Sequence, residues 1–476
     1  MNPRSLGIQL VCAAAFVIAA ASPSGAQSAQ PPGGGNPFAG LFKGSPADQP
    51  HRLDLNGSTF VAWDDNVLAQ APNGSPDQIG LDPRGVRQGF ASGFQAAASY
   101  GLHTGGPRNQ FSADAQGSLQ QFASTAGQNL LFESYGGSVG FRTGLTPKTT
   151  LSTGAGYSYA PFYQYAPFLQ STMNPESPVG SDYGYAATSE WVRTTRANAM
   201  VENRFSKRSR VSADVAWEQR LYPDNPLFDI DTSTVHGVFT HNLTKKLTVH
   251  VGYGLQKSEF KARSSPTPLQ HDLDFGIGYG DGITISFARH YTLAMSIGAS
   301  VVRRQDPFGT TEAGRETTFV VIGGATLSRS IGRTWATSIG YTRGTSYVVG
   351  FPQPMLTDSA NAGIGGPIAG RLYFSAGAGA TQGQQLFQPS SGSTSRLVSY
   401  TASTRLTFGL FKSLGLYTQA SYYKYSVPED FHSFGFTPKL DRRSVSAGLT
   451  AWLPLIKPPR TRRTDDPMQQ NSTGQP

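Results

Sequence analysis

The chain has 476 residues, a formal net charge of +9 at pH 7, and only 38% hydrophobic and 14% charged residues. Its 55 glycines, 20 tyrosines and 28 phenylalanines favour an all-β protein over a helical one. Much of the net positive charge lies in short turns and in the C-terminal tail, and no basic helix or aromatic-basic strand platform accompanies it, which argues against nucleic-acid binding.

The first 50 residues predict an exported protein. Arg4 precedes the compact apolar run LGIQLVCAAAFVIAAA, and small residues near Ala26 suit cleavage, so residues 1–26 are predicted to be a signal peptide. The alternative is a single-helix membrane anchor, for which the run is short. Cys12, the only cysteine, lies in this run, so the mature chain has neither disulfides nor thiolate metal sites. Residues 27–50 are rich in proline and glycine and predict a flexible segment, in which NPFAGLF is a candidate plug.

From residue 51 a hairpin-sized unit repeats. Short, often basic turns are predicted at 103–109, 146–149, 206–210, 244–246, 288–291, 330–334, 369–371 and 411–413. Longer connections alternate with them at 64–87, 120–132, 162–186, 222–231, 259–268, 304–314, 348–355, 382–393 and 427–441. Eight turns and nine loops join eighteen strands, with sixteen as the alternative count, and both chain ends fall on the short-turn side.

The segments between these connections alternate with a period of two. In RVSADVAWEQRL, Val211, Val215 and Trp217 share one face, and Asp214 and Glu218 share the other. Long loops at one end, short turns at the other and this alternation predict a single antiparallel outer-membrane β-barrel over residues 51–454. Soluble β-sandwich, propeller and β-helix folds are the alternatives.

The stretch LDFGIGYGDGITISF breaks the alternation. Strict alternation would direct Asp281 toward lipid together with Tyr279 and Ile283. A carboxylate at that depth costs on the order of a few kcal/mol. We therefore predict a β-bulge around Gly280 to Gly282 that turns Asp281 inward.

The polar face of the predicted barrel is rich in charge. The candidates to line the lumen are Asp114, Arg142, Arg196, Glu202, Arg204, Asp214, Glu218, Arg220, His250, Asp272, Asp274 and Arg405. Asp54, Arg304 and Asp358 are predicted on the same face. Such charge indicates a hydrated interior. Arginines 193, 196, 204 and 220 could form a basic ladder, although nearby carboxylates favour a compensated network.

The sequence offers little support for an enzyme. The histidines are 51, 103, 236, 241, 250, 271, 290 and 432, and none lies in a motif such as H-E-x-x-H or G-x-S-x-G. The protein is therefore predicted not to be an enzyme and to use no cofactor or metal, with an outer-membrane enzyme as a less favoured alternative.

The first strand ends in WDDNVLAQ, residues 63–70, whose oxygen atoms suit either a divalent cation or simple solvation at the mouth of a loop. STFVAWDDNV and the hairpins that follow over most of residues 51–454 resemble outer-membrane porins of the "beta-barrel porin 2" type, some of which are linked to exopolysaccharide systems. The resemblance implies an outer-membrane barrel with a transport role and supplies no catalytic residues.

The last predicted strand contains Trp452, a candidate closing aromatic. It is followed by a basic, proline-containing tail, residues 455–476, which predicts a disordered periplasmic segment.

The predicted function is an outer-membrane channel for passive passage or export of polar solutes or polysaccharide. The alternative is a structural or adhesive surface barrel with an occluded lumen. The predicted partners are outer-membrane lipids, lipopolysaccharide and the barrel-assembly machinery, with exopolysaccharide export components implied by the resemblance. No sequence feature indicates the solute or the oligomeric state.

Overall fold

The structure is a computed structural model that describes residues 51–65, 89–104, 109–124, 129–161, 191–223, 226, 229–244, 247–260, 269–283, 291–305, 315–332, 334–347, 354–386, 396–426 and 439–455. The predicted signal peptide, the segment 27–50 and all but the first residue of the predicted tail lie outside these residues. The described part of the chain contains no helical segment with the length and apolar character of a membrane span.

Eighteen strands make up the fold. They are β1 (His51–Asp64), β2 (Gly89–Thr104), β3 (Asn109–Ser124), β4 (Asn129–Gly144), β5 (Thr149–Pro161), β6 (Trp191–Asn203), β7 (Ser209–Leu221), β8 (Ile230–Asn242), β9 (Thr248–Phe260), β10 (Leu269–Ile283), β11 (Tyr291–Gln305), β12 (Arg315–Ile331), β13 (Trp335–Tyr347), β14 (Pro354–Ala369), β15 (Leu372–Gln385), β16 (Arg396–Phe411), β17 (Leu414–Ser426) and β18 (Lys439–Pro454).

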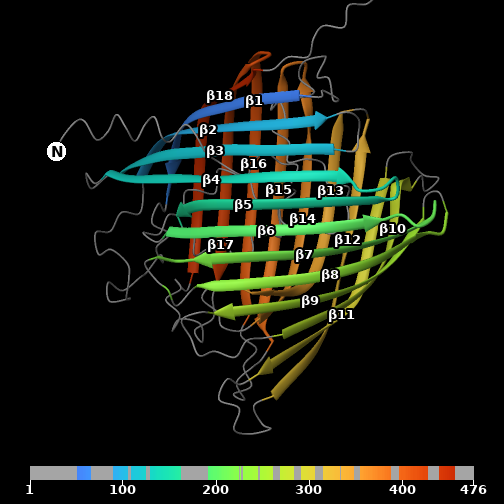
Figure 1. Cartoon of the computed structure of the whole chain (residues 1–476). Coiled ribbons are helices and arrows are strands. Elements are labelled where there is room, and N and C mark those ends of the chain that lie inside the picture. Colours follow the sequence, from blue (N-terminus) through green and yellow to red (C-terminus); the bar gives the residue numbers. More distant parts are fainter. Residues whose placement is uncertain are drawn as a thin grey trace, which may run out of the picture.

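The strands close into one antiparallel barrel. Each strand pairs with its neighbours in sequence, and β18 returns to pair with β1, where Asp54 lies opposite Pro454. Figure 1 shows β2–β9 crossing the near wall, with β12–β18 behind them. Closure removes both sheet edges and pairs the backbone polar groups along the wall. The prediction of an all-β, eighteen-stranded barrel is confirmed, and the alternative of sixteen strands is excluded.

The two ends of the barrel differ in their connections. The connections after the even-numbered strands from β4 are short, for example 145–148 between β4 and β5, and β1 begins and β18 ends at this turn end. Most connections at the opposite, loop end are longer, up to 162–190 between β5 and β6. The prediction of a long loop over residues 120–132 is wrong, because β3 continues to Ser124 and β4 begins at Asn129. Phe122 and Leu130 pair there and extend the ladder.

Apolar side chains cover the outer face of the wall. The exposed large side chains include Val61, Phe94, Leu119, Phe141, Val215, Val235, Val251, Phe275, Ile297, Val321, Ile339, Tyr400, Leu416 and Leu449. They come from strands all around the barrel and alternate with residues that point inward. A continuous apolar surface of this extent far exceeds the patches that soluble monomers expose.

The predicted irregularity in β10 is present. Tyr279 pairs with Leu293, but the next pair joins Ile283 to Tyr291, so the register of β10 against β11 shifts between Tyr279 and Ile283. An extra stretch of chain on one strand is what a bulge requires. The side chain of Asp281 lies outside the described side chains, so its inward orientation stays a prediction.

The seam between β1 and β18 is fastened at the loop end by a buried ion pair. Arg442 Nε lies 3.1 and 2.9 Å from the two carboxylate oxygens of Asp64. The Asp64 side chain is 0% exposed and that of Arg442 8%. A charge removed from water to this degree needs an opposite charge beside it, which each of the two residues supplies to the other.

Asp65 forms two further hydrogen bonds across the seam at the same end of the barrel. Its carboxylate accepts a 2.7 Å hydrogen bond from the backbone amide of Arg443, and its own amide donates to the Arg443 carbonyl at 3.1 Å. Burial raises the pKa of the Asp65 carboxyl above its ordinary value, and the hydrogen bond from Arg443 opposes that shift. Both carboxylates of the WDDN segment therefore act at the seam. Among the described residues, no group of three or more His, Cys, Asp or Glu side chains is arranged to hold a metal ion.

Two aromatic rings cover glycines at mid-seam. A Cβ atom at Gly93 of β2 would lie 2.6 Å from the ring of Phe60 on β1, and one at Gly448 of β18 would lie 2.8 Å from the ring of Tyr417 on β17. Covering a strand glycine with a neighbouring aromatic ring is a recognised way to stabilise a sheet. The seam is thus packed as well as hydrogen-bonded.

Candidate functional site

Most of the predicted charged residues that face the interior lie on one part of the wall. Inward positions, which alternate with the exposed apolar residues, hold Asp114, Arg142, Arg196, Glu202, Asp214, Glu218, Arg220, His236, His250, Asp272 and Asp274 on β3, β4 and β6–β10, and Arg405 on β16. The predicted candidate Arg204 lies one residue beyond β6, in the short turn, with 64% of its side chain exposed.

The wall formed by β13–β15 is different. Its inward positions hold small or neutral residues such as Ser338, Asn361, Gly363, Ser375 and Thr381, and no charged side chain faces inward along these three strands. Asp358, predicted to face inward, points outward instead. It accepts hydrogen bonds from Arg343 and from the exposed Tyr341 on β13. The prediction failed because Gly, Ala and Ser dominate β14 and leave its alternation without a clear apolar phase.

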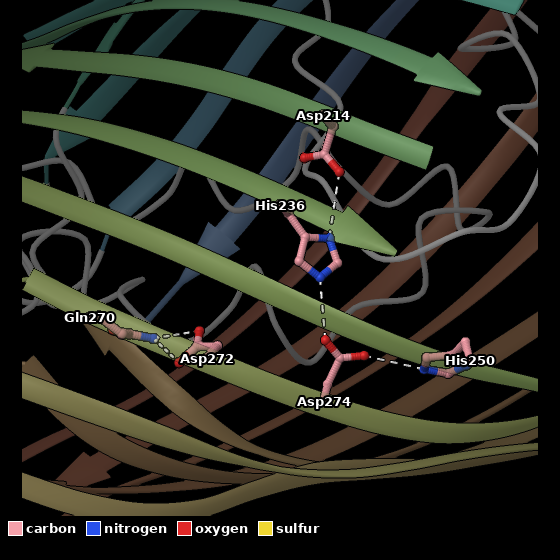
Figure 2. Close-up of polar contacts among 6 residues, drawn as sticks. All are labelled: Asp214, His236, His250, Gln270, Asp272 and Asp274. Carbon is pink, nitrogen blue, oxygen red and sulfur yellow. Dashed lines mark hydrogen bonds and ion pairs between the residues drawn. The ribbon is translucent and has the colours of Figure 1, made fainter. Parts of the chain in front are cut away.

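Four side chains on the charged wall are connected in a row of contacts, shown in Figure 2, which runs from Asp214 through His236 to Asp274 and there turns to His250. His236 Nδ1 lies 3.5 Å from Asp214 Oδ1, and His236 Nε2 lies 3.3 Å from Asp274 Oδ1. His250 Nε2 lies 3.3 Å from the other oxygen, Asp274 Oδ2. We call these four residues the His–Asp array. Their side chains are between 24 and 32% exposed, so water reaches all four.

The array crosses four strands, and glycines on β9 and β10 make room for it. His236 lies on β8 and Asp274 on β10, so their contact spans β9 at Gly252 and Gly254, which pair with Asp274 and His236 respectively. A Cβ at Gly252 would collide with the Asp274 carboxylate, and one at Gly276 with the His250 ring. In VGYGLQ, the glycines therefore leave room for the His–Asp array on the inner face, while Tyr253 between them lies on the outer face.

A further carboxylate lies beside the array. Asp272 is on the inner face of β10, two residues before Asp274, and accepts hydrogen bonds of 3.0 and 2.7 Å from Gln270 Nε2 (Figure 2). This part of the wall therefore carries three carboxylates and two imidazoles.

Toward the loop end, the neighbouring strands carry a compensated ion-pair network. Arg196 Nε lies 2.6 Å from Glu218 Oε2, and Arg220 Nη2 lies 2.5 Å from Glu218 Oε1. Arg193 is not part of it, because its guanidinium lies 5.8 Å from the Tyr159 ring centroid on the opposite face. These contacts favour the compensated network over the basic ladder.

Other predicted residues stand apart from both groups. Glu202 contacts Arg204 at 2.8 Å and Arg210 at 3.9 Å near the turn end. Asp114 accepts a 3.2 Å hydrogen bond from Ser138 on the adjacent β4. Across the barrel, the Arg405 guanidinium lies 4.2 Å from the centroid of the Tyr417 ring. Asp54 is buried on the inner face, and the side chain of Arg304 lies outside the described side chains.

The residue that the sequence-based candidates missed is His236, which links the two halves of the array. The alternation in TVHGVF was a usable signal, because Val235 and Phe239 face outward and leave His236 on the opposite face.

No protein-family model and no curated protein matches the chain. Three solved structures from Pseudomonas aeruginosa illustrate what it is similar to, each aligned over 85% of this chain and 98% of the other. They are OccK9 (OpdG), 12% identical with a TM-score of 0.42, OpdQ, 12% identical at 0.41, and OccK2 (OpdF) in complex with glucuronate, 13% identical at 0.41. These similarities are distant, and the resemblance to "beta-barrel porin 2" proteins stays a prediction.

Proposed function

We propose that the chain is a channel of the bacterial outer membrane for passive passage or export of polar solutes, polysaccharide included. The observation that carries this proposal is the contrast between the two faces of one closed barrel. The outer face is apolar all around, which suits lipid, and the inner face carries ionisable side chains that water reaches. An interior of this kind suits a hydrated path. Outer-membrane lipids and lipopolysaccharide would then surround the wall, and the barrel-assembly machinery would insert it.

A specific observation favours the alternative, a structural or adhesive barrel with an occluded lumen. Several inward polar side chains near the loop end are fully or almost fully buried, among them Ser258, Gln270, Ser300 and Thr381. Burial at that level is what an occluded lumen would produce.

Single-channel recording in planar bilayers distinguishes the two functions. We expect stable, ohmic current steps from the full mature chain, because hydrated ionisable groups line the wall. A second protein lacking residues 27–50 serves as the comparison. Steps that appear only after this deletion would identify the proline- and glycine-rich segment as a plug of a channel. Silence from both proteins, once barrel folding is verified by circular dichroism and heat-dependent electrophoretic migration, would favour the occluded barrel.

A further inference from the structure

We propose that the His–Asp array is a proton-controlled site on the channel wall that attracts cations by its charge. With His236 neutral, the carboxylate of Asp214 turns toward the lumen, where it attracts a small cation or the ammonium group of a passing solute. With His236 protonated, the same carboxylate is held by the ring and the site is closed. This inference rests on the proposed channel function and adds to it a class of ligand and its control.

The two carboxylate contacts of His236 depend on how many protons its ring carries. His236 has a carboxylate oxygen near each ring nitrogen, at 3.5 Å for Asp214 and 3.3 Å for Asp274. A neutral imidazole has one N–H and one lone pair, whereas the imidazolium has two N–H groups. Only the charged ring can donate to both carboxylates. The neutral ring donates to one and turns a lone pair toward the other.

When His236 loses a proton, one of its two carboxylate contacts is lost, and the geometry indicates which one. The contact of His236 with Asp274 is the shorter one and satisfies the geometry of a hydrogen bond. Asp274 is also held from β9 by His250 at 3.3 Å, whereas the contact of Asp214 with the His236 ring is the longer one, at 3.5 Å. When His236 loses a proton, the repelled carboxylate is therefore that of Asp214, which is 31% exposed and can turn toward the lumen.

The same proton changes the charge that a solute meets. Asp214 from β7 and Asp274 from β10 contact the His236 ring, and Asp274 also contacts the His250 ring. Asp272 lies on the same inner face of β10, two residues before Asp274. With His236 neutral, this part of the wall, with its three carboxylates, is one unit of charge more negative than with His236 protonated. The cations on the inner face of the neighbouring wall are already paired, Arg196 and Arg220 with Glu218 and Arg210 with Glu202. A surface of one sign within low-dielectric walls concentrates the opposite ion.

The experiment measures reversal potentials of the full mature chain in planar bilayers under a KCl gradient, at about pH 5 and about pH 8, on either side of the range in which histidine titrates. We expect the K⁺/Cl⁻ permeability ratio of the unchanged protein to rise roughly fivefold from the lower to the higher pH, the size of one unit charge at contact distance in water.

Variants locate the effect. In His236→Gln, which cannot be protonated, we expect the ratio to stay high at both pH values, and in Asp214→Asn to stay low at both. His271→Gln is the matched control, because His271 lies on β10, the strand of Asp274, but its ring hydrogen-bonds Tyr253 on the outer face. It should keep the pH dependence of the unchanged protein.

The outcomes distinguish a failure of the proton-controlled site from a failure of the channel function. An open channel whose pH dependence is the same in the unchanged protein, His236→Gln and Asp214→Asn would overturn the proton-controlled site and leave the channel function standing. Absence of current from every folded protein would overturn the channel function and the site with it.

Discussion

Asp64→Asn is expected to lower the free energy of unfolding of the barrel by about 3–5 kcal/mol, the usual cost of removing one partner from a buried ion pair. The change leaves the guanidinium of Arg442, which is 8% exposed, without the carboxylate that it contacts through two nitrogen atoms. Because this pair joins β1 to β18, the loss falls on the strand pairing that closes the barrel. Urea titration of the protein in lipid vesicles measures the effect.

Two further variants show whether charge burial is the cause. Asp64→Leu combined with Arg442→Met removes both charges and should recover most of the stability, since apolar residues of similar size often replace a buried pair without loss. Glu259→Gln is the matched control, because Glu259 pairs with Lys257 and the two side chains are 47 and 54% exposed. Exposed pairs contribute only about 0–1 kcal/mol. Equal losses from Asp64→Asn and Glu259→Gln would contradict a special role for the seam pair.

Ile297→Arg is expected to destabilise the folded barrel by about 2–4 kcal/mol, the cost of a basic side chain on the lipid face near the bilayer midplane. Ile297 lies in the middle of β11, its side chain is 62% exposed on the outer face, and its neighbours across the sheet are Phe275 and Gly323. The same titration in vesicles provides the measurement.

Ser296→Arg is the control for this prediction. Ser296 is the preceding residue of the same strand and faces the interior, where it pairs with Gly276 and Gly324. A charge introduced there meets water rather than lipid and should cost much less. If the two arginines cost the same, the outer face is not the membrane-facing one, and the proposed location is wrong.

The barrel itself was predictable because a strand in such a wall repeats one constraint. Val211, Val215 and Trp217 identify the outer face of β7 without knowledge of any neighbour, and short basic turns mark the strand ends. The same reasoning failed at Asp358, where Ala360 and Ala362 are the outward residues and carry too little apolar character to set the phase. Alternation is informative only where the two faces differ in chemistry.

The contacts of the site required the register between strands, which alternation does not provide. Asp274 and His236 lie 38 residues apart and meet only because β8, β9 and β10 pair so that Gly254 lies between them. The seam pair is more distant still, at 378 residues, because it depends on the last strand returning to the first. Asp-Asp-Asn consequently appeared in the sequence as a cation site or a solvated loop mouth, and no local feature pointed to Arg442.

The even number of strands has a practical consequence for experiments in cells. β1 begins and β18 ends at the same rim, where Leu455 donates a backbone hydrogen bond of 2.8 Å to Leu53. Epitope tags or fluorescent proteins fused to either terminus of the barrel would emerge in the same compartment. Labels meant to face the opposite side of the membrane belong in the connections at the other rim, and paired insertions of the two kinds would report the orientation of the protein in living cells.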